Sequence, residues 1–416
     1  MTKRSRIIVW SIVAGLIVLV AAPIAFTFAF STLRTKSVTA TKIAISQASE
    51  SPTVVTSALP PGFEPESPSF VSSDTGFVLG ISHCASGSCV TIARTQDGGR
   101  TWTSIPAPDV SLTEPGNPKS SNGSVSKIRF LNINDGFLFG PGLYATHDGG
   151  TRWQKITLQG IPSSYVVTAL ESNGSNTYLI AVNPNVSPSP NYLFISDAPT
   201  GLFIKSKSVF PTGTPTQISA NLYGAVLTAN NHGSVLTPLS AQIGTLYYQA
   251  TGTAIWTRIK AHCPSGLSAD RLVALATPVL GSSTPQLILG CVGGAGAGSQ
   301  EKTVVQSGDL KTTSPARARP PLGGILEAIA SPDGKTIAVA ASSGATFLYV
   351  SIDSGTTWKT AISDPTFGGA PIHDLGFTTP TQGFAVMGHA TSAGNRTSIF
   401  LMTYDQGLSW PEIRFL

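Results

Sequence analysis

Charged residues are scarce in this chain. Asp, Glu, Lys and Arg make up 11% of its 416 residues, whereas about 25% is usual for a soluble domain. The net charge is +5, but residues 1–42 hold six basic residues and no acidic one. The remaining chain carries 20 basic and 21 acidic residues. Because a nucleic-acid surface needs clustered Lys and Arg, we expect no nucleic-acid partner.

Helical patterns and common catalytic motifs are also missing. No segment after residue 30 repeats apolar residues at the 3.6-residue period of a helix, so we expect almost no helix there. The sequence has no phosphate-binding glycine loop followed by Lys-Ser/Thr, no His-Glu-x-x-His and no Gly-x-Ser-x-Gly. The glycine-rich stretch 293–298 precedes no expected helix, so we interpret it as a flexible loop. We therefore expect no cofactor, no metal ion and no catalytic residue.

Cysteine is limited to four residues, which fall into two pairs by position. Cys84 and Cys89 flank a short Ala-Ser-Gly-Ser segment, and Cys263 and Cys291 lie farther along the chain. Two disulfides are typical of an exported domain. A histidine precedes the first cysteine of each pair, at 83 and 262, so a Cys/His metal site is the alternative. The usual spacing of paired metal ligands is missing, which favours disulfides.

One long apolar run lies at the N-terminus. Residues 7–30 contain no charge and follow Lys3, Arg4 and Arg6. These 24 residues are enough to span a bilayer of about 30 Å, and they exceed the roughly 7–15 apolar residues of a cleaved signal. We predict a cytoplasmic tip and transmembrane anchor over 1–30, with cleavage near residues 21–22 as the alternative. With the disulfides, this predicts a single-pass protein of the cell membrane with its N-terminus in the cytoplasm.

One short phrase is present four times. Each copy has an Asp, a Gly two positions later and a Trp three positions after that, at Asp97, Gly99, Trp102, Asp148, Gly150, Trp153, Asp353, Gly355, Trp358, Asp405, Gly407 and Trp410. Successive copies are 51 residues apart at one end, 52 at the other and 205 across the middle. Because 205 is close to four times 51, three degenerate copies of the motif fit in the gap, near 196–201, 251–256 and 306–309. We therefore count seven repeats.

A second phrase precedes the first. A Phe, a Gly six positions later and an aromatic residue after that Gly recur at 70–77, 130–137 and 377–384. We expect a strand, a polar turn in which Gly supplies a positive φ, and a buried strand. Together the phrases predict four-stranded units in which the Asp carboxylate holds a turn and the Trp packs on neighbouring strands. Seven such units predict an all-β, seven-bladed β-propeller over residues 69–416, joined to the anchor by a Ser/Thr/Pro-rich tether over 31–68.

The Asp-Gly-Trp phrase resembles the Asp-box, or bacterial neuraminidase repeat, which is found almost entirely in β-propellers. The two phrases in this order resemble the exported seven-bladed propellers related to photosystem II stability/assembly factors. This resemblance covers roughly residues 69–413 and is faint from 160 to 320. It implies a binding or assembly scaffold rather than an enzyme. The chain departs from that family in its anchor and in its few arginines, so only the scaffold role is carried over.

The Asp-box also resembles sialidases, in fold only. That resemblance would imply three arginines on a substrate carboxylate, a Tyr–Glu nucleophile pair and an Asp acid/base. The aromatic-Arg-Ile-Pro motif of those enzymes is absent, and the most similar segment is Ile128-Arg129-Phe130. Glu327 and Tyr349 are present, but neither lies in a recognisable catalytic context. A sialidase-type glycoside hydrolase therefore remains the alternative function.

Long connections indicate the binding face. In a propeller with these phrases, the long irregular stretches 80–90, 106–126, 183–190, 293–302 and 388–398 are expected on the face opposite the Asp turns. The candidate binding residues in or near them are Asp109, Glu114, Glu301, Lys302, His389 and Arg396. Solvated loops of no function would look the same. The sequence therefore predicts a membrane-anchored, extracytoplasmic propeller that binds an unknown envelope protein or glycan through this face.

Overall fold

A computed structural model describes most of the chain after residue 56. The described residues are 57–113, 123–185, 192–197, 202–205, 226–230, 233–237, 245–253, 255–260, 262–276, 285–310, 312–366 and 368–415. Within these ranges the secondary structure is strand, bridge, turn and bend, with no helix. None of the described residues therefore forms a helix that could cross a membrane. The predicted anchor over residues 1–30 lies outside the described ranges.

The described strands form seven antiparallel sheets, each built from strands that are consecutive in sequence. The first three sheets contain β1 (Glu64–Phe70), β2 (Gly76–Cys84), β3 (Gly87–Thr95), β4 (Thr103–Ile105); β5 (Lys127–Phe130), β6 (Gly136–Phe139), β7 (Leu143–Thr146), β8 (Gln154–Lys155); and β9 (Val166–Ser172), β10 (Asn176–Val182), β11 (Tyr192–Asp197), β12 (Ile204–Lys205). Each strand pairs with the next, so every sheet is a meander.

The remaining four sheets repeat the pattern. They contain β13 (Val226–Asn230), β14 (Gly233–Thr237), β15 (Thr245–Ala250), β16 (Thr257–Lys260); β17 (Ser268–Ala276), β18 (Gln286–Gly296), β19 (Ser299–Ser307), β20 (Ser314–Pro315); β21 (Ile325–Ala330), β22 (Ile337–Ser342), β23 (Thr346–Ser351), β24 (Lys359–Asp364); and β25 (Ile372–Phe377), β26 (Gly383–Gly388), β27 (Ser398–Thr403). After β27, Glu412 forms a bridge with Leu401, and the Ile413 N–H donates to the Phe400 carbonyl at 2.8 Å. The C-terminal residues thus extend the last sheet.

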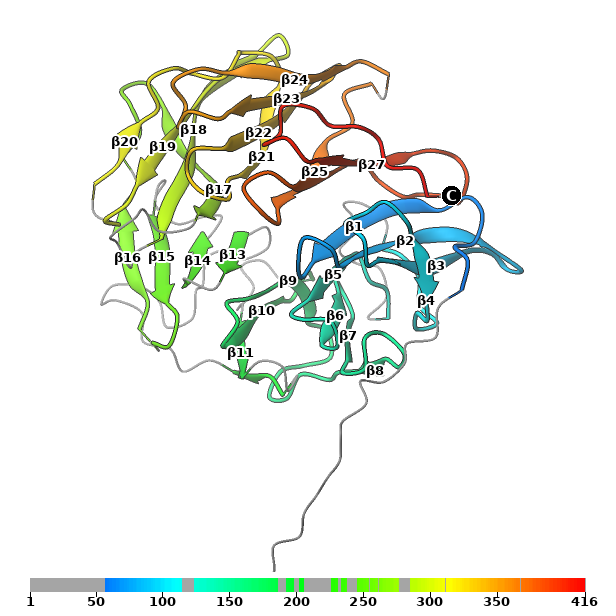
Figure 1. Ribbon diagram of the computed structural model, residues 1–416. Coiled ribbons are helices and arrows are strands. Elements are labelled where there is room, and N and C mark those ends of the chain that lie inside the picture. The colour runs from blue at the N-terminus through cyan, green and yellow to red at the C-terminus, as the bar shows by residue number, and fades with distance from the viewer. Residues whose placement is uncertain are drawn as a thin grey trace, which may run out of the picture. The chain divides into compact units, whose positions relative to one another are not determined.

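Neighbouring sheets contact each other mainly through their first strands, as Figure 1 allows the reader to follow. The contacts join β1 to β5, β6 to β9, β9 to β13, β13 to β17, β17 to β21 and β21 to β25, and the last sheet returns to β1 through β26 and β27. This closed series of six four-stranded meanders and one three-stranded meander, which the C-terminal residues extend, is the architecture of a β-propeller. The all-β prediction and the predicted order of strands around the two phrases are confirmed.

The core lies between the sheets, because each sheet is covered on both faces by its neighbours. All of β2 up to Ser82 is buried, as are all of β22 and β27. Phe77 of the first sheet stacks on Phe130 of the second, with ring centroids 3.6 Å apart. This two-sided burial explains why the sequence shows continuous apolar runs after the repeated glycines instead of strict alternation.

The glycines of the second phrase are needed for a reason that differs from our expectation. None of Gly76, Gly136 and Gly383 has a positive φ, so that prediction is wrong. A β-carbon at Gly136 would lie 2.7 Å from the ring of Phe130, and one at Gly76 would lie 2.4 Å from the ring of Phe70. The phenylalanine that ends the first strand therefore covers the glycine that begins the second and leaves no room for a side chain.

One hydrogen-bond pattern recurs in the four turns of the first phrase. At Asp353, Oδ1 accepts from the Ser351 hydroxyl and from the Thr357 N–H, both at 2.8 Å, and Oδ2 accepts from the Thr357 hydroxyl at 2.7 Å. Equivalent Oδ1 bonds hold the turns of Asp97, Asp148 and Asp405. Asp309, in one of the degenerate copies, accepts in the same way from residues two positions before it and three after it. These carboxylates therefore stabilise their own turns by accepting hydrogen bonds from residues of the same turn.

The glycines act within their turns, whereas the tryptophans make contacts of two kinds. The glycines have φ values of +93°, +89°, +78° and +85° at Gly99, Gly150, Gly355 and Gly407. The indole N–H groups of Trp102 and Trp410 donate to the carbonyl of the glycine in their own turn, at 3.1 and 2.8 Å. Those of Trp153 and Trp358 donate instead to carbonyls after the fourth strand of the preceding sheet, at 3.0 and 3.1 Å. The tryptophans thus fasten turns and, in two cases, join sheets.

Three segments differ from the predicted loops and tether. β2 and β3 continue through most of 80–90, with Cys84 paired to Gly87. β18 and β19 continue through 293–302, so the stretch 293–298 is mostly strand, and only Ala297 and Gly298 form its turn with positive φ. Our interpretation of a flexible loop there is wrong, because cross-strand hydrogen bonds satisfy this backbone. Residues 64–68, which we expected in the tether, belong to β1.

Candidate functional site: a polar cluster on the inner strands

Ionisable side chains gather on the first strands of the sheets, through which neighbouring sheets meet. Eight of them form what we call the central cluster: Glu66 on β1, Lys127 and Arg129 on β5, Glu171 on β9, Glu327 on β21, His373 and Asp374 on β25, and His389 just after β26. They come from five sheets. Because partly buried charges need partners, their contacts with one another define what this site can do.

Two cations and two carboxylates form one half of the cluster. Lys127 Nζ lies 3.1 Å from Asp374 Oδ2, and Arg129 Nε lies 2.8 Å from Glu171 Oε1. A second guanidinium nitrogen of Arg129 lies 3.8 Å from Asp374 Oδ1. The exposed fractions of these side chains are between 10% and 27%. The network therefore joins three sheets by charge pairing in a partly desolvated place.

Burial and pairing act on these groups in opposite directions. Burial alone would raise the pKa of Asp374, but the charges of Lys127 and Arg129 outweigh it and lower the pKa to about 2. Burial alone would lower the pKa of Arg129, whereas Glu171 and Asp374 raise it above its ordinary value. Burial raises the pKa of Glu171 in spite of Arg129. At neutral pH, Asp374 and Arg129 are thus fixed charges of opposite sign.

Two imidazoles and a carboxylate form the other half. The rings of His373 and His389 are stacked, with centroids 4.1 Å apart and planes inclined by 19°. Glu66 Oε1 lies 3.0 Å from His389 Nδ1 and 3.5 Å from His373 Nε2. Burial, with the charge of Lys127, lowers the pKa of His373 to about 4, so its ring is neutral at neutral pH. Its Nε2 therefore donates to the Glu66 carbonyl, 2.8 Å away.

Glu327 adds a carboxyl group with spare hydrogen-bonding capacity. One oxygen accepts from the Ser342 hydroxyl. The other, Oε2, is buried and has no hydrogen-bond partner among the described residues. Burial raises the pKa of Glu327, opposed by the Ser342 bond and by the charge of His389. This carboxyl group can therefore accept, or when protonated donate, one more hydrogen bond.

The loop between β26 and β27 is fastened to the first sheet by two glutamates of β1. The carboxylate of Glu64 accepts from the N–H groups of Arg396, Thr397 and Ser398 at 2.6, 3.1 and 3.3 Å. Oε2 of Glu66 accepts from the N–H of Ala390 at 2.9 Å. The loop that carries His389 is thus held at both ends by carboxylates from a strand more than 300 positions earlier in the sequence.

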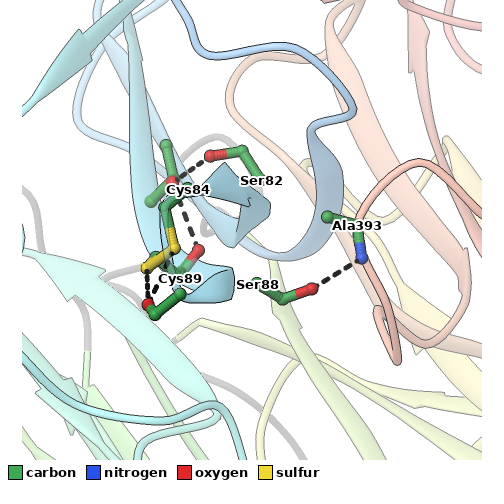
Figure 2. The surroundings of a disulfide bond; sticks show 7 residues. Ser82, Cys84, Ser88, Cys89 and Ala393 are labelled. Carbon is green, nitrogen blue, oxygen red and sulfur yellow. Dashed lines mark hydrogen bonds between the residues drawn. A yellow bond between two sulfur atoms is a disulfide. The ribbon is translucent and has the colours of Figure 1, made fainter.

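The disulfide hairpin of the first sheet supports the same loop. Cys84 and Cys89 are bonded at the tip of β2 and β3, and the Ser88 hydroxyl accepts from the N–H of Ala393 at 3.1 Å, as Figure 2 shows. The N–H of Gly394 donates to the carbonyl of Gly62 at 3.0 Å. The predicted ranges 80–90 and 388–398 therefore lie side by side, next to the central cluster.

Both predicted disulfides are confirmed. The second joins Cys263, ahead of β17, to Cys291 in β18, and no cysteine is free. Because a disulfide sulfur has no thiolate to offer, the Cys/His metal site is wrong. His83 instead lies against Gly62 and Gly394 at the hairpin tip.

The predicted binding residues have different surroundings. His389 belongs to the central cluster, and Arg396 pairs with Glu412 at 2.7 Å with 63% of its side chain exposed. Asp109 is exposed after β4, and Glu301 pairs with Arg319. Glu114 lies outside the described residues, as do 114–122 and 186–190 of the predicted loops. Only His389 and Arg396 are thus brought to one loop.

Lys302 is buried, which differs from the expectation of a surface residue. It is 1% exposed in β19. Its ammonium donates to the carbonyls of Gln300, Leu322, Gly323 and Gly324 at 2.8–3.0 Å. Burial lowers its pKa to about 8. Lys302 therefore holds the connection before β21 in place and is not available to a partner.

The residues considered for a sialidase do not assemble a catalytic set. Arg129 is the one arginine of the central cluster, and its guanidinium is engaged by Glu171 and by the carbonyls of Pro68 and Ile128. The hydroxyl of Tyr349 donates to the Gly323 carbonyl at 2.9 Å. The central cluster therefore offers neither a three-arginine clamp nor a tyrosine nucleophile.

Sequence reasoning missed most of the central cluster. Glu66, Lys127, Glu171, His373 and Asp374 were not singled out, and Arg129 was read only as a strand residue. Their position in the repeats could have indicated them, because each of these residues lies on the first strand of a repeat, where neighbouring sheets meet. A search of the repeats for polar residues on first strands would have found them.

No family model and no curated protein matches the sequence. Several solved structures are similar in fold. One is YCF48 bound to D1 peptide, with 16% identity, a TM-score of 0.50, and coverage of 84% of this chain and 96% of that chain. Another is an ulvan lyase bound to a sugar, with 10% identity, a TM-score of 0.51, and coverage of 86% and 97%. A third is a puromycin-hydrolyzing peptidase of Mycobacterium tuberculosis, with 11% identity, a TM-score of 0.52, and coverage of 86% and 56%. Likeness at such low identity concerns the fold, and it supports a β-propeller.

Proposed function

We propose that this chain is a single-pass protein of the cell membrane whose extracytoplasmic part is a seven-bladed β-propeller. It binds a protein of the cell envelope and serves as a scaffold for it. The observation that carries the proposal is the loop 388–398, which presents the partly exposed His389 and the exposed Arg396, whereas the charges of the central cluster pair with one another. The seven sheets of the described residues support the blade number, and the two disulfides support an oxidising location.

A protein segment is the favoured ligand. The loop 388–398 presents the partly exposed His389 and the exposed Arg396, and the partly exposed Glu412 lies beside Arg396. Peptides carry backbone donors and acceptors as well as charges of both signs, so they can pair with such a mixed surface. The YCF48 structure, which is similar in fold, is described as bound to a D1 peptide. The order of the two repeated phrases also resembles that of assembly-factor propellers. A cell-envelope glycan is the other ligand class.

A sialidase-type hydrolase is the alternative from a different functional class. It needs several arginines converging on one carboxylate and an activated nucleophile. Arg129 is the one arginine in the central cluster, and carboxylates of the protein itself already engage it. The chemistry of the described residues therefore favours binding over hydrolysis.

The proposal is tested by affinity capture with the full chain on detergent-solubilised cell envelope. Two charge reversals form a matched pair. Arg396→Glu lies on the loop 388–398, and Arg152→Glu changes an arginine in an Asp turn on the opposite face; the two side chains are 63% and 87% exposed. We expect one envelope protein to be captured by the wild type and by Arg152→Glu. Arg396→Glu should weaken that capture by roughly fivefold or more, as expected for an interface residue.

The outcomes separate the ligand classes. Capture that is unaffected by Arg396→Glu but lost in Arg152→Glu would assign binding to the other face and overturn the proposal. If the chain retained a purified envelope glycan and captured no protein, the ligand would be a glycan and not a protein. A parallel assay with a fluorogenic sialoside addresses the alternative, since turnover that is abolished by Arg129→Ala would identify an enzyme.

A further inference from the structure

We propose that Glu66, His373 and His389 form a binding site for a divalent transition-metal ion, with Zn²⁺ the best match. The three residues lie where the last sheet meets the first. One ligand atom from each, a carboxylate oxygen and two ring nitrogens, falls within 4.8 Å of the others. This inference shares His389 with the loop of the proposed function, but its test measures an ion and needs no envelope partner.

The separations between donor atoms suit a tetrahedral ion. Glu66 Oε1 lies 3.0 Å from His389 Nδ1 and 3.5 Å from His373 Nε2. Zinc with nitrogen and oxygen ligands about 2.0–2.1 Å away has ligand atoms about 3.3 Å apart along each tetrahedral edge. The main-chain carbonyl of Glu66, 2.8 Å from His373 Nε2, is a fourth oxygen at the same place. The two ring nitrogens lie within 4.8 Å of each other, which is the separation that has to shorten.

The donor set selects the class of metal. Two imidazoles and one carboxylate form a set that catalytic zinc sites use, and imidazole also suits copper, iron and nickel. Calcium and magnesium prefer sites made only of oxygen ligands. Glu327 interacts electrostatically with His389, and its buried Oε2 has no hydrogen-bond partner among the described residues. It thus provides a carboxylate of the kind that commonly accepts the remaining N–H of a metal-bound imidazole.

Binding requires two local adjustments. The imidazole rings are stacked, with planes inclined by only 19°, so one ring must tilt before both lone pairs converge on an ion. His389 is 28% exposed and lies on a loop, so it is the ring that can tilt. The proton on His373 must also move to Nδ1, which is buried and has no partner among the described residues. Because these changes oppose binding, we expect a dissociation constant in the micromolar range rather than the nanomolar range.

An ion at this site would join the two ends of the ring. Glu66 lies on β1, whereas His373 and His389 follow it by 307 and 323 positions. A link between residues so far apart restricts the unfolded chain strongly, and a ligand that binds only the folded state raises its stability. We therefore expect metal binding to raise the melting temperature of the propeller as well as to occupy the site.

The test is titration of the chelator-treated full chain with zinc sulfate, followed by calorimetry and thermal unfolding. The wild type should bind one Zn²⁺ per chain and melt at a higher temperature in its presence. His389→Ala should weaken binding at least tenfold and abolish the stabilisation. His147→Ala is the matched control, because His147 is exposed and pairs with a carboxylate, Asp135, in the second sheet. This control should bind zinc like the wild type.

A second measurement uses the wild type alone, in case His389→Ala fails to fold. Cobalt(II) should bind in place of zinc, and X-ray absorption should resolve two imidazole ligands in its first coordination shell. Absence of saturable zinc binding to the wild type would overturn the proposal. Binding that is unchanged in His389→Ala, or lost in His147→Ala, would locate the ion elsewhere and overturn it equally.

Discussion

At the scale of single residues, the aspartates of the repeated turns are held as charged groups. The N–H and hydroxyl of Thr357, with the Ser351 hydroxyl, lower the pKa of Asp353 from 3.8 to about 2. A carboxylate with a lowered pKa in the folded state stabilises the fold above its unfolded pKa. This contribution is lost as the pH falls through the folded pKa. The four turns are therefore expected to weaken together in acid.

Asp353→Asn isolates one of these charges. We expect the variant to unfold at lower denaturant concentration than the wild type at neutral pH. We expect the difference to shrink as the pH falls from about 4 to about 2, because the wild-type carboxylate becomes protonated over that window. Urea unfolding followed by tryptophan fluorescence at several pH values measures this. The exposed Asp109→Asn serves as the control, and a pH-independent difference for Asp353→Asn would contradict the role of the charge.

Lys302 shows where residue-level reading of the sequence fails. Glu301 and Lys302 are adjacent in β19, so their side chains point to opposite faces. Glu301 is 44% exposed, whereas Lys302 is buried among four carbonyls. Composition predicted both as surface residues. The carbonyls that bind the Lys302 ammonium belong mostly to residues 322–324, and their approach is set by the neighbouring sheet rather than by the local sequence.

At the scale of elements, the first hairpin of the first, second and last sheets depends on contact between its phenylalanine and its glycine. Gly136 has no positive φ, so alanine is compatible with its backbone, but a β-carbon would lie 2.7 Å from the Phe130 ring. We expect Gly136→Ala to destabilise the protein by about 1–3 kcal/mol, as overpacked cores do. In a Phe130→Leu background, most of this loss should disappear because the ring is gone.

A double-mutant cycle measured by urea unfolding tests the steric explanation. The coupling between Gly136→Ala and Phe130→Leu should be large and favourable, since the two residues are in direct contact. Additive losses would mean that the glycine is needed for its backbone freedom, as the sequence had suggested. The exposed Gly160, at which a β-carbon would meet nothing but which has a φ of +76°, gives the comparison for a purely conformational loss.

The repeated phrases predicted the elements well but not the central cluster. The order of strand, Gly turn, strand and Asp turn matches β1 to β4, because each of these contacts lies within about 40 residues. Glu66 and His373 are 307 positions apart. No local pattern relates them, and they meet only because the ring closes. The spacing of motifs along one sequence therefore cannot predict which side chains pair where the first and last sheets meet.

At the scale of the whole molecule, the ring closes without exchange of strands. The described strands of each sheet are consecutive in sequence, so no N-terminal strand completes the last sheet. Other contacts join the ends instead: Ser67 donates to Asp374 at 3.0 Å, Trp102 packs edge-on against Phe400, and the N–H of Gly394 donates to the carbonyl of Gly62. The carboxylate of Glu64 adds hydrogen bonds to the loop 388–398. Closure thus depends on a few residues of the first sheet.

Glu64→Gln tests this closure with little change of shape. Glu64 is 4% exposed and accepts from three backbone N–H groups. Hydrogen bonds to charged groups contribute about 1.5–3 kcal/mol each. The NH2 group of glutamine would also face a backbone N–H, so that two hydrogen-bond donors oppose each other. We expect a loss of at least about 2 kcal/mol in the free energy of unfolding, and faster hydrogen exchange at residues 389–398. Unfolding in urea and exchange mass spectrometry measure the two effects.

Glu412→Gln is the matched control for this prediction, because Glu412 contacts the same loop through the exposed Arg396. An exposed ion pair contributes about 0–1 kcal/mol, so this variant should change stability and exchange only slightly. If Glu64→Gln lost stability while exchange at 389–398 stayed slow, the carboxylate would be stabilising β1 itself rather than the closure. If both variants behaved like the wild type, the aromatic contacts of Trp102 and Phe400 would be sufficient to hold the ring closed.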